Sequence, residues 1–429
     1  MKNTYSIVNK NIDVTKELQN IIDSLNVNET LLVVSGTYLV TNLFLHSNMT
    51  LIFEEGSILI SNSNGEYKNI YTRVAGINMN YYAAVLNIID CKNVTIKGKG
   101  LIDGKGEYFY NLYWGSDKLG GIRKEYDKLG IRFLADYDLN RVRNVLIQNS
   151  SNINLSDIKS KDSGFWNIHV LYSNNVKVSN VVVECKNLNS PSTDGIDIDS
   201  SSNVLIDNCI LDTNDDSICV KSGRDSDGLK TNIKSSNIKI TNCTINRGFG
   251  ITIGSEVSGG IEDVLISNIT YNNTDCGFRI KSSKSRKGYI KNIIFKDIKM
   301  NNVKYPIHIN LDWNRKYCNN VIPTNLNIEM KEHYYKLIEK VSDDIKNTII
   351  DNILISNVDT YYSFDYKEGS RAFQIVGFSD SIINNFNIEN SKFNCLEFGH
   401  IAYANVNFNN VEINVSKTNS KELDEYDNR

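Results

Sequence analysis

One short phrase returns nine times along this 429-residue chain. It reads asparagine or aspartate, then alternating apolar and variable residues, then a second polar residue and a further apolar one. Copies begin at Asn93, Asn152, Asn175, Asn203, Asn237, Asp263, Asn292, Asn352 and Asn405. Between Asn175 and Asn292 the copies start 28, 34, 26 and 29 residues apart. Alternation of apolar and polar residues is the period of a β-strand, so each copy predicts a short strand.

A short strand cannot bury its apolar face alone, but stacked copies of it can. Strands that return every ~25–30 residues with turns between them predict the coils of a parallel β-helix. A β-sandwich would not regenerate one phrase in register, and a leucine-rich repeat would need helical segments between the copies. The composition agrees, because only 3 prolines suit unbroken ladders and about 60 asparagines suit turns or stacked amides.

The segments between and around the copies predict one domain over residues 1–429. Residues 13–25 form an amphipathic helical pattern with Asp13 or Thr15 as N-cap, and such a helix would cap the open end of the stack. Two charged or Tyr-rich stretches, 108–139 and 318–347, interrupt the repeat and are expected to leave the stack. The polar tail 416–429 is expected to fray.

Charge, hydropathy and cysteine spacing exclude several classes of protein. A net charge of -3 argues against a nucleic-acid partner. No run of 18 apolar residues is present, so no membrane helix is expected. No signal peptide is visible, which predicts a cytoplasmic protein if Met1 is the native start and a secreted one otherwise. The 8 cysteines form no CxxC pair, and Cys209 and Cys243 take a buried position of the repeat, so we expect reduced packing cysteines.

A second strand of each repeat shows which side chains face outward. The copies are GIDIDS from Gly195, SICVKS from Ser217, GITIGS from Gly250, GFRIKS from Gly277 and PIHINL from Pro306. When they are aligned, every inward position is apolar. The outward positions include Asp197, Asp199, Lys221, Arg279, Lys281 and His308.

Three carboxylates gather where these strands begin. Asp194 precedes one strand, Asp215 and Asp216 precede the next, and the alignment stacks Asp194 near Asp216 with Phe249 in the coil that follows. Coils lie ~4.8 Å apart, so the carboxylates are expected within about 5–10 Å, with the cations of the outward face roughly 10 Å away. Crowding raises the pKa of one carboxyl, which can then act as an acid, while a second stays ionised and activates water. Glycoside hydrolysis needs this pair.

The cations of the same face suit an anionic sugar. Arg279 can pair with a uronate carboxylate in a forked geometry, beside Lys281. Other readings stay open: the aspartates can be turn residues or calcium ligands, His308 can be structural, and His169 can either line the groove or pack beneath it. The glycines of residues 98–106 read as coil turns, because no helix follows them as a phosphate loop requires.

The chain also resembles a known family. STDGIDIDS, TNDDSICVKSGRD, GFGITIGSEVSGG and GFRIKSS resemble, in order, the four motifs of family 28 glycoside hydrolases, which are right-handed, single-stranded parallel β-helices that cut pectin with inversion. The resemblance implies that Asp215 is the general acid and that Asp194 and Asp216 hold and deprotonate the attacking water. It implies that Arg279 and Lys281 bind the substrate carboxylate, with no metal or cofactor and with a pectic polysaccharide or oligosaccharide as partner. Further candidates for substrate binding on the groove face are Lys221, His308, Phe249 and His169.

The sequence departs from the family at one important position. Polygalacturonases carry Gly-His-Gly where this chain has Gly248-Phe249-Gly250, and Ser192 replaces a usual Asn. Rhamnogalacturonan hydrolases also depart at the histidine, and segments such as INLDWNRKY from Ile309 resemble bacterial members associated with rhamnogalacturonan. The two stretches that leave the stack would close one end of the groove and favour exo action. A uronate polysaccharide lyase and a non-catalytic glycan-binding β-helix are the alternatives.

Overall fold

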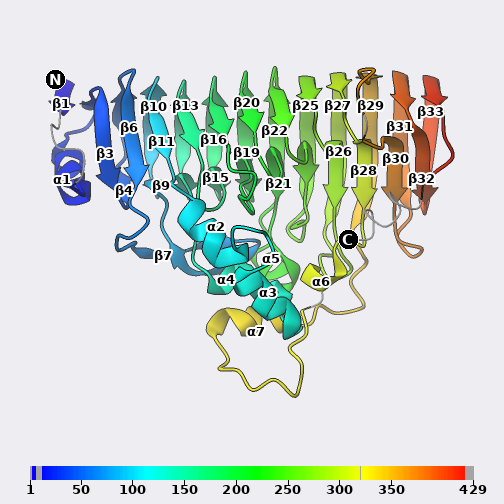
Figure 1. Cartoon of the computed structure of the whole chain (residues 1–429), viewed down its shortest axis with the longest axis horizontal. Helices are drawn as coiled ribbons and strands as arrows, with labels where there is room; N and C mark the ends of the chain where they lie inside the picture. The colour runs from blue at the N-terminus through cyan, green and yellow to red at the C-terminus, as the bar shows by residue number, and fades with distance from the viewer. Residues whose placement is uncertain (1, 6–11, 319, 367, 421–429) are drawn as a thin grey trace.

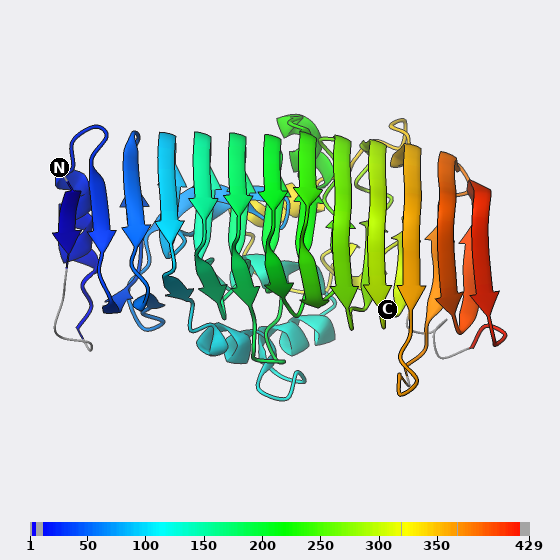
Figure 2. The same ribbon diagram turned by 90° about the horizontal axis from the view of Figure 1, so that it is seen from above.

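A computed structural model describes residues 2–5, 12–318, 320–366 and 368–420 of the chain. The strands stack side by side in chain order along the long axis of the molecule, and helices gather on one side of the stack (Figure 1). Seen from above, the same strands form an unbroken row from the N-terminal to the C-terminal coil (Figure 2). The predicted right-handed, single-stranded parallel β-helix with an N-terminal helix is confirmed.

Two parallel sheets make up the coil stack. The sheet that carries the outward charges contains β4 (Leu43–Leu45), β9 (Leu86–Ile89), β12 (Val145–Gln148), β15 (Ile168–Leu171), β18 (Ile196–Asp199), β21 (Ile218–Lys221), β24 (Ile251–Ile253), β26 (Cys276–Lys281), β28 (Tyr305–Asn310), β30 (Arg371–Val376) and β32 (Glu397–Ala402). We call it the groove sheet. The second sheet holds the repeated phrase and contains β1 (Lys2–Tyr5), β2 (Thr30–Val33), β3 (Gly36–Val40), β5 (Met49–Phe53), β6 (Ser57–Ser61), β10 (Lys92–Gly98), β11 (Leu101–Asp103), β13 (Ser151–Ser156), β14 (Lys159–Lys161), β16 (Asn174–Ser179), β17 (Val182–Glu184), β19 (Ser202–Asp207), β20 (Ile210–Asp212), β22 (Ser235–Thr241), β23 (Thr244–Arg247), β25 (Ile261–Asn272), β27 (Tyr289–Asn301), β29 (Ile349–Tyr361), β31 (Ile383–Cys395) and β33 (Ala404–Val415).

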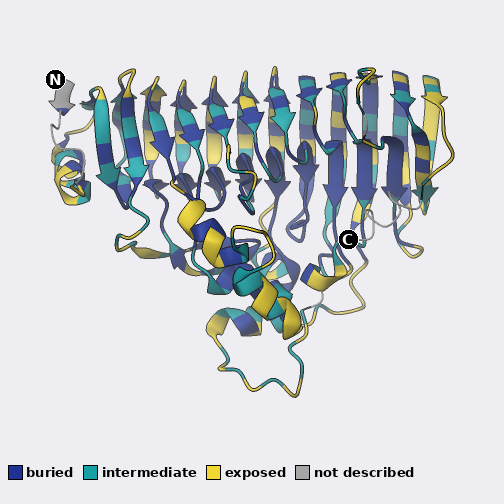
Figure 3. Cartoon of the chain, in the orientation of Figure 1, coloured by how far each residue is buried: buried dark blue, intermediate teal, exposed yellow. Residues whose placement is uncertain are grey.

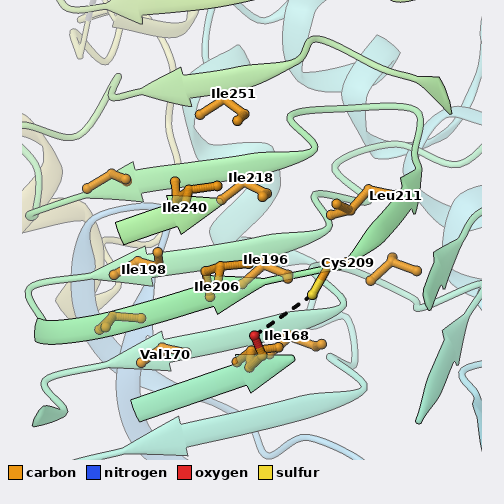
Figure 4. Close-up of a cluster of buried hydrophobic side chains, with 14 of the residues drawn as sticks. Ile168, Val170, Ile196, Ile198, Ile206, Cys209, Leu211, Ile218, Ile240 and Ile251 are labelled. Carbon is orange, nitrogen blue, oxygen red and sulfur yellow. Dashed lines mark hydrogen bonds between the residues drawn. The ribbon is translucent and has the colours of Figure 1, made fainter. Parts of the chain in front are cut away.

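The core lies between the two sheets, where identical positions of successive coils stack on one another. Ile196 pairs with Ile218, Ile218 with Ile251, and Ile251 with Phe278. All of these side chains are buried, and Figure 4 shows the three isoleucines together with residues of the opposite sheet such as Ile206 and Ile240. The register agrees with the alignment made from the sequence. Cys209 and Cys243 are buried free thiols in this core, as predicted.

Asparagine ladders explain much of the unusual composition. Asn152 donates its side-chain amide to Asn93 at 2.9 Å and accepts one from Asn175 at 2.6 Å. Each of these residues has a φ near +55°, a left-handed conformation that Asn tolerates better than other non-glycine residues. Another rung at the same position of the repeat joins the Asn352 amide to Asn292 at 2.8 Å across 60 residues.

Helix α1 (Thr15–Ser24) lies at the N-terminal end of the stack and buries Leu18 and Ile22. It begins two residues later than predicted, and Val14 takes the N-cap position without a side-chain bond. Asp13 instead accepts a hydrogen bond from the Thr15 amide at 2.9 Å. At the other end, Asn419 bonds the backbone of Gly399, so the start of the predicted frayed tail is held. Residues 421–429 lie outside the described residues.

A second body, which we call the roof, covers part of the groove sheet. It consists of residues 69–82, 107–139 and 322–338. Its elements are the antiparallel hairpin β7 (Asn69–Val74) and β8 (Ile77–Tyr82), the helices α2 (Glu107–Trp114), α3 (Gly121–Lys128), η1 (Arg132–Leu134) and α4 (Ala135–Asp138), and α7 (Glu332–Ile338). Two more helices follow strands of the groove sheet: α5 (Asp225–Thr231) comes after β21, and α6 (Arg315–Cys318) comes after β28. Burial differs among the roof helices, since α2 buries Phe109, Tyr110 and Tyr113 whereas α3 has no buried residue (Figure 3).

The roof has its own hydrophobic cluster and is tied to the stack by buried polar groups. Its cluster contains Ile77, Phe133, Tyr334 and Leu337, among others. Asp138 accepts hydrogen bonds from Tyr126, Lys331, His333 and Tyr334, which join 107–139 to 322–338. Arg73 of the hairpin reaches Asp199 of β18 at 2.8 Å, and both side chains are fully buried. No helix among the described residues is long and apolar enough to cross a membrane.

Candidate active site

The candidate site lies where β18, β21 and β24 begin, because three successive turns bring polar residues together there. The Gly195 amide donates to the Asp216 carbonyl, so the turns carrying Asp194 and Asp216 lie side by side. In the next turn, Gly248 has a φ of +95°, and a Cβ there would lie 2.5 Å from the Asp215 carbonyl oxygen. The amide of Phe249 donates to that same oxygen. Glycine at 248 therefore allows the close approach that places Phe249 beside the carboxylates.

Asp216 is held by cations two coils away. Its oxygens accept from Lys281 at 2.7 Å, from Arg279 at 3.3 Å and from the Thr252 hydroxyl at 2.7 Å. The side chain is buried, and burial is outweighed by Lys281 and Arg279, so the pKa of Asp216 falls to about 2. Asp216 is therefore ionised throughout the neutral range.

Asp194 belongs to a second buried group. Lys221 lies 3.0 Å from Asp194 and 2.7 Å from Asp197, so one ammonium serves two carboxylates. Burial raises the pKa of Asp194 well above its usual range, and it raises the pKa of Asp197 to about 7. Lys221 opposes both shifts. A group with two carboxylates and one cation binds a proton more easily than a simple ion pair does.

Asp215 differs from both neighbours because it is less buried and has no cation bound to it among the described residues. Its enclosure and the carboxylates of Asp194 and Asp216 raise the pKa of Asp215 to about 7. The three aspartates thus combine an ionised group with a group that is protonated near neutral pH. Carboxyl oxygens of Asp194 and Asp216 lie within 4.8 Å of each other, close enough for one water molecule to contact both.

An aromatic ring lies against each of the three cations of the site. The guanidinium of Arg279 lies 4.7 Å from the Phe249 ring, and the ammonium of Lys281 lies 4.6 Å from the ring of Trp313. The Lys221 ammonium lies 3.8 Å from the ring of Trp166. Such contacts hold a cation in place and keep water from one of its sides.

These residues line one cleft of about 890 Å³. Its lining includes the three aspartates, Lys221, Phe249, Arg279 and Lys281, all of which the sequence predicted as site residues. Roof residues such as Trp114 and Arg132 line it as well. Trp114, Trp166 and Trp313 also line the cleft, and they were not predicted because each lies outside the aligned strand segments.

Two predicted substrate-binding residues do not line the cleft. His169 is 0% exposed, because the hairpin of the roof covers β15, and it contacts Arg143 at 2.9 Å and Asp199 at 3.7 Å. Its assignment to substrate binding is therefore corrected to packing beneath the roof. His308 is 5% exposed, lies against the Tyr305 ring and is likewise absent from the cleft lining.

Arg247 directly precedes Gly248-Phe249-Gly250, the segment in which Phe249 takes the place of the family's histidine. It lies on the cleft, but its guanidinium bonds Asp212 at 2.6 Å and the carbonyl of Cys185. Among the described residues, no hydrogen bond or ion pair joins Arg247 to Asp215.

One set of atoms beside the cleft has the spacing of a metal site. Asp194, Asp216 and Cys219 each present a ligand atom within 4.8 Å of the others. The two carboxylates are already paired with Lys221, Lys281 and Arg279, and the Cys219 thiol donates to the Gly254 carbonyl. A cation would have to compete with three resident positive charges, so this donor set does not fit a metal well.

Comparison with known proteins gives a consistent result. The profile of the family described as "Glycosyl hydrolases family 28" matches residues 71–357. A probable polygalacturonase of Vitis vinifera is 26% identical over 343 residues, which cover 76% of this chain and 66% of that protein. An exo-poly-alpha-D-galacturonosidase of Dickeya chrysanthemi is 27% identical over 321 residues, or 67% of this chain and 52% of that protein. The chain therefore spans about half to two thirds of the length of these curated relatives.

Solved structures agree on the fold. The crystal structure of a hyperthermoactive exopolygalacturonase from Thermotoga maritima superimposes with a TM-score of 0.76. The alignment covers 94% of this chain and 88% of that one, at 24% identity.

Proposed function

Since the chain belongs to family 28 of the glycosyl hydrolases, we propose that it hydrolyses the galacturonate-containing backbone of pectin, or oligosaccharides derived from it, by an inverting two-carboxylate mechanism. The observation that carries this proposal is the contrast between neighbouring aspartates. Asp215 has its pKa raised to about 7, and Asp216 has its pKa lowered to about 2. Two carboxyl groups with separated pKa values are what acid and base roles require.

In this mechanism Asp215 protonates the leaving glycosidic oxygen. It is the most accessible of the three aspartates and remains protonated up to near neutral pH. Asp194 and Asp216 hold the attacking water between oxygens that lie within 4.8 Å of each other. The ionised Asp216 accepts the proton of that water as its oxygen attacks the anomeric carbon.

The charges of the cleft suit an anionic sugar. Asp216, Arg279 and Lys281 together carry one net positive charge. A substrate carboxylate placed beside Arg279 and Lys281 neutralises that charge and gains charge-assisted hydrogen bonds. The rings of Phe249 and Trp313 hold both cations in position for it.

The roof supports action at a chain end. It buries the outward face of the groove sheet on the N-terminal side of the site, where Leu146, His169 and Asp199 are all 0% exposed. At the last coil the same face is open, with Phe398 38% exposed. A polymer cannot pass through a groove closed on one side, so we propose that products are released one short unit at a time from an end.

A digest tests the proposal directly. Homogalacturonan, rhamnogalacturonan and short oligomers of each are incubated with the protein, and products are identified by mass and by the anomer released. Saturated products with inverted configuration, with monomer or dimer dominating at early times, are expected. Unsaturated products that absorb ultraviolet light would assign the protein to the lyases. A ladder of many lengths at early times would contradict exo action.

A further inference from the structure

A second hollow lies toward the C-terminal end of the stack, around the ends of β29, β31 and β33 (Figure 1), and the mechanism above does not use it. It has a volume of about 640 Å³, and its lining includes Tyr361, Tyr362, Phe364, Tyr366, Ile413 and Val415. We call it the distal groove. Tyr361 is 61% exposed and Phe364 is fully exposed. Apolar surface that gathers in one exposed hollow is typical of a binding site.

The distal groove lies on the row of turns that holds the catalytic aspartates. Backbone amides link each turn to the carbonyl of the turn before it: Phe249 to Asp215, Asp275 to Gly248, Lys304 to Thr274 and Arg371 to Lys304. Arg371 ends the turn between β29 and β30, which forms one wall of the distal groove. This turn is therefore four coils beyond Asp215, or about 19 Å at ~4.8 Å per coil.

Tyr366 lies between the distal groove and the cleft. Its phenol has a raised pKa, first because of burial and then because of the carboxylates of Glu368 and Asp275. Asp275 lines the cleft, and Tyr366 lines the distal groove. The two hollows are thus near enough for the charge of one to affect a group in the other. A substrate chain that leaves the cleft on its open, C-terminal side meets the distal groove next.

The wall formed by this turn is held in place by the preceding coil. The Tyr362 hydroxyl donates to the Val303 carbonyl at 2.5 Å, and the ring of Tyr362 lies 5.2 Å from that of Tyr366. The Ser363 amide donates to the side chain of Asn302 at 2.9 Å. Because these contacts already order the turn, a ligand can bind with little loss of conformational entropy in the protein.

The distal groove differs from the cleft in charge. Cations line the cleft, whereas none of the described side chains that line the distal groove is charged. In the turn between β29 and β30, the charged residues that the structure describes are Asp365 and Glu368, both acidic. The opposite wall is flanked by one charge of each sign, Glu412 and Lys417. An anionic sugar would gain no ion pair in this lining, while flat aromatic rings suit the apolar face of an uncharged pyranose.

We infer that the distal groove binds an uncharged sugar of the substrate chain, on the part of the chain that extends away from the catalytic site. This inference rests on the proposed hydrolase function and adds a second binding site to it. Methyl-esterified galacturonate and rhamnose are two sources of an uncharged pyranose in pectin. A chain held in the distal groove stays bound while its end is cut, so one encounter serves several cuts.

The first experiment compares long and short substrates. Values of KM are measured on long methyl-esterified homogalacturonan, on long rhamnogalacturonan and on digalacturonate, which is too short to extend from Asp215 to the distal groove. For Tyr361→Ser/Phe364→Ser, the ratio of polymer KM to dimer KM is expected to rise about tenfold, because two ring contacts are lost. The polymer that shows the rise identifies the source of the uncharged sugar.

A matched control and a charged polymer sharpen this comparison. Tyr335→Ser removes a ring of similar exposure, 59%, from α7 outside both hollows, and it should keep the wild-type ratio. An unchanged ratio in Tyr361→Ser/Phe364→Ser on both polymers would overturn the inference. An equal rise on fully de-esterified homogalacturonan would also overturn it, because every sugar of that polymer is charged.

Hydrogen exchange separates failure of this inference from failure of the proposed function. Asp215→Asn is incubated with each long polymer, and exchange is read by mass spectrometry. Protection of residues 361–366 and 413–415 supports the distal groove even where the wild type hydrolyses none of the polymers, a result that would refute the proposed function alone. Hydrolysis by the wild type without this protection would overturn the distal groove alone.

Light scattering tests the other occupant of an exposed apolar hollow, a second copy of this chain. The wild type is expected to have the same mass as Tyr361→Ser/Phe364→Ser. A dimer that dissociates in the double variant would assign the distal groove to self-association and overturn the inference.

Discussion

The coil stack and the roof bury their apolar side chains in different ways. In the stack, one position of each coil repeats in the next, and asparagine ladders run beside the core. In the roof, three segments far apart in sequence meet in one cluster. Asp138 joins two of them through His333, and buried Arg73 ties the hairpin to the stack. The stack holds the carboxylates, and the roof closes one side of the cleft. Under the proposed function, the catalytic groups and the walls that limit access to them come from separate parts of the molecule.

If the stack holds the catalytic groups, substituting its general acid should lower activity more than any other single substitution. Asp215→Asn is expected to lower kcat on oligogalacturonate by about 10³-fold or more, because the leaving group is no longer protonated. The thermal midpoint should stay the same or rise, since the substitution relieves carboxylate repulsion. A variant that retains a tenth of the activity would move the acid role to another residue.

The roof should be separable from the stack by one substitution. Asp138→Asn removes the charge that four donors share, and we expect the roof to open about 30–100-fold more often, or about 2–3 kcal/mol. Hydrogen exchange read by mass spectrometry should rise in residues 69–82 and 322–338, while β18 and β21 stay protected. Uniform acceleration across both regions would show that the roof and stack unfold as one unit.

Lowering the pH should open the roof in the same way as the Asp138→Asn substitution. Burial of Asp138 is outweighed by the hydrogen bonds it accepts, beginning with His333, which hold its pKa below the usual range. Such a group stabilises the folded state above its unfolded pKa of ~3.9, and this contribution disappears as pH falls through the folded value. The roof should therefore exchange faster than the stack below about pH 4.

The pH dependence of activity should reflect the ionisation of the aspartates in the stack and not that of Asp138 in the roof. Asp215 must be protonated to act, and its pKa is raised to about 7. We expect kcat/KM to fall about tenfold for each pH unit above that value and to stay level below it until Asp216, whose pKa is lowered to about 2, is protonated. The Asp138→Asn variant should show the same fall in kcat/KM on the alkaline side. An optimum above pH 8 would exclude Asp215 as the acid.

The smallest effect is expected in a ladder. Asn152→Ala removes two side-chain hydrogen bonds and leaves alanine with a φ of +58°. We expect the free energy of unfolding to fall by about 1–2 kcal/mol. Asn152→Gly keeps the left-handed backbone without strain and should lose less. Comparing the thermal midpoints of the two variants separates the contribution of the hydrogen bonds from that of the backbone conformation. Equal losses would mean that conformation contributes nothing here.

The stack could be predicted from the sequence because the alternation of apolar and polar residues shows which side chains point inward. The register of Ile196, Ile218, Ile251 and Phe278 follows from five aligned segments, and that register placed Asp194 beside Asp216. It failed where contacts are made across the roof. Two roof segments were predicted to leave the stack, but nothing periodic relates Asp138 to His333, which are 195 residues apart. The packing of these segments on each other and the burial of His169 beneath the roof therefore could not be predicted.

The asparagine ladders have an evolutionary consequence. An amide rung of ordinary length joins Asn152 to Asn175 across 23 residues, and another joins Asn292 to Asn352 across 60. The stack therefore resumes in register whatever length of chain is inserted between two coils. New loops can be acquired, lengthened or exchanged at the groove edge without rebuilding the scaffold, so descendants of one ancestral solenoid can diverge in specificity while inheriting the same catalytic turns.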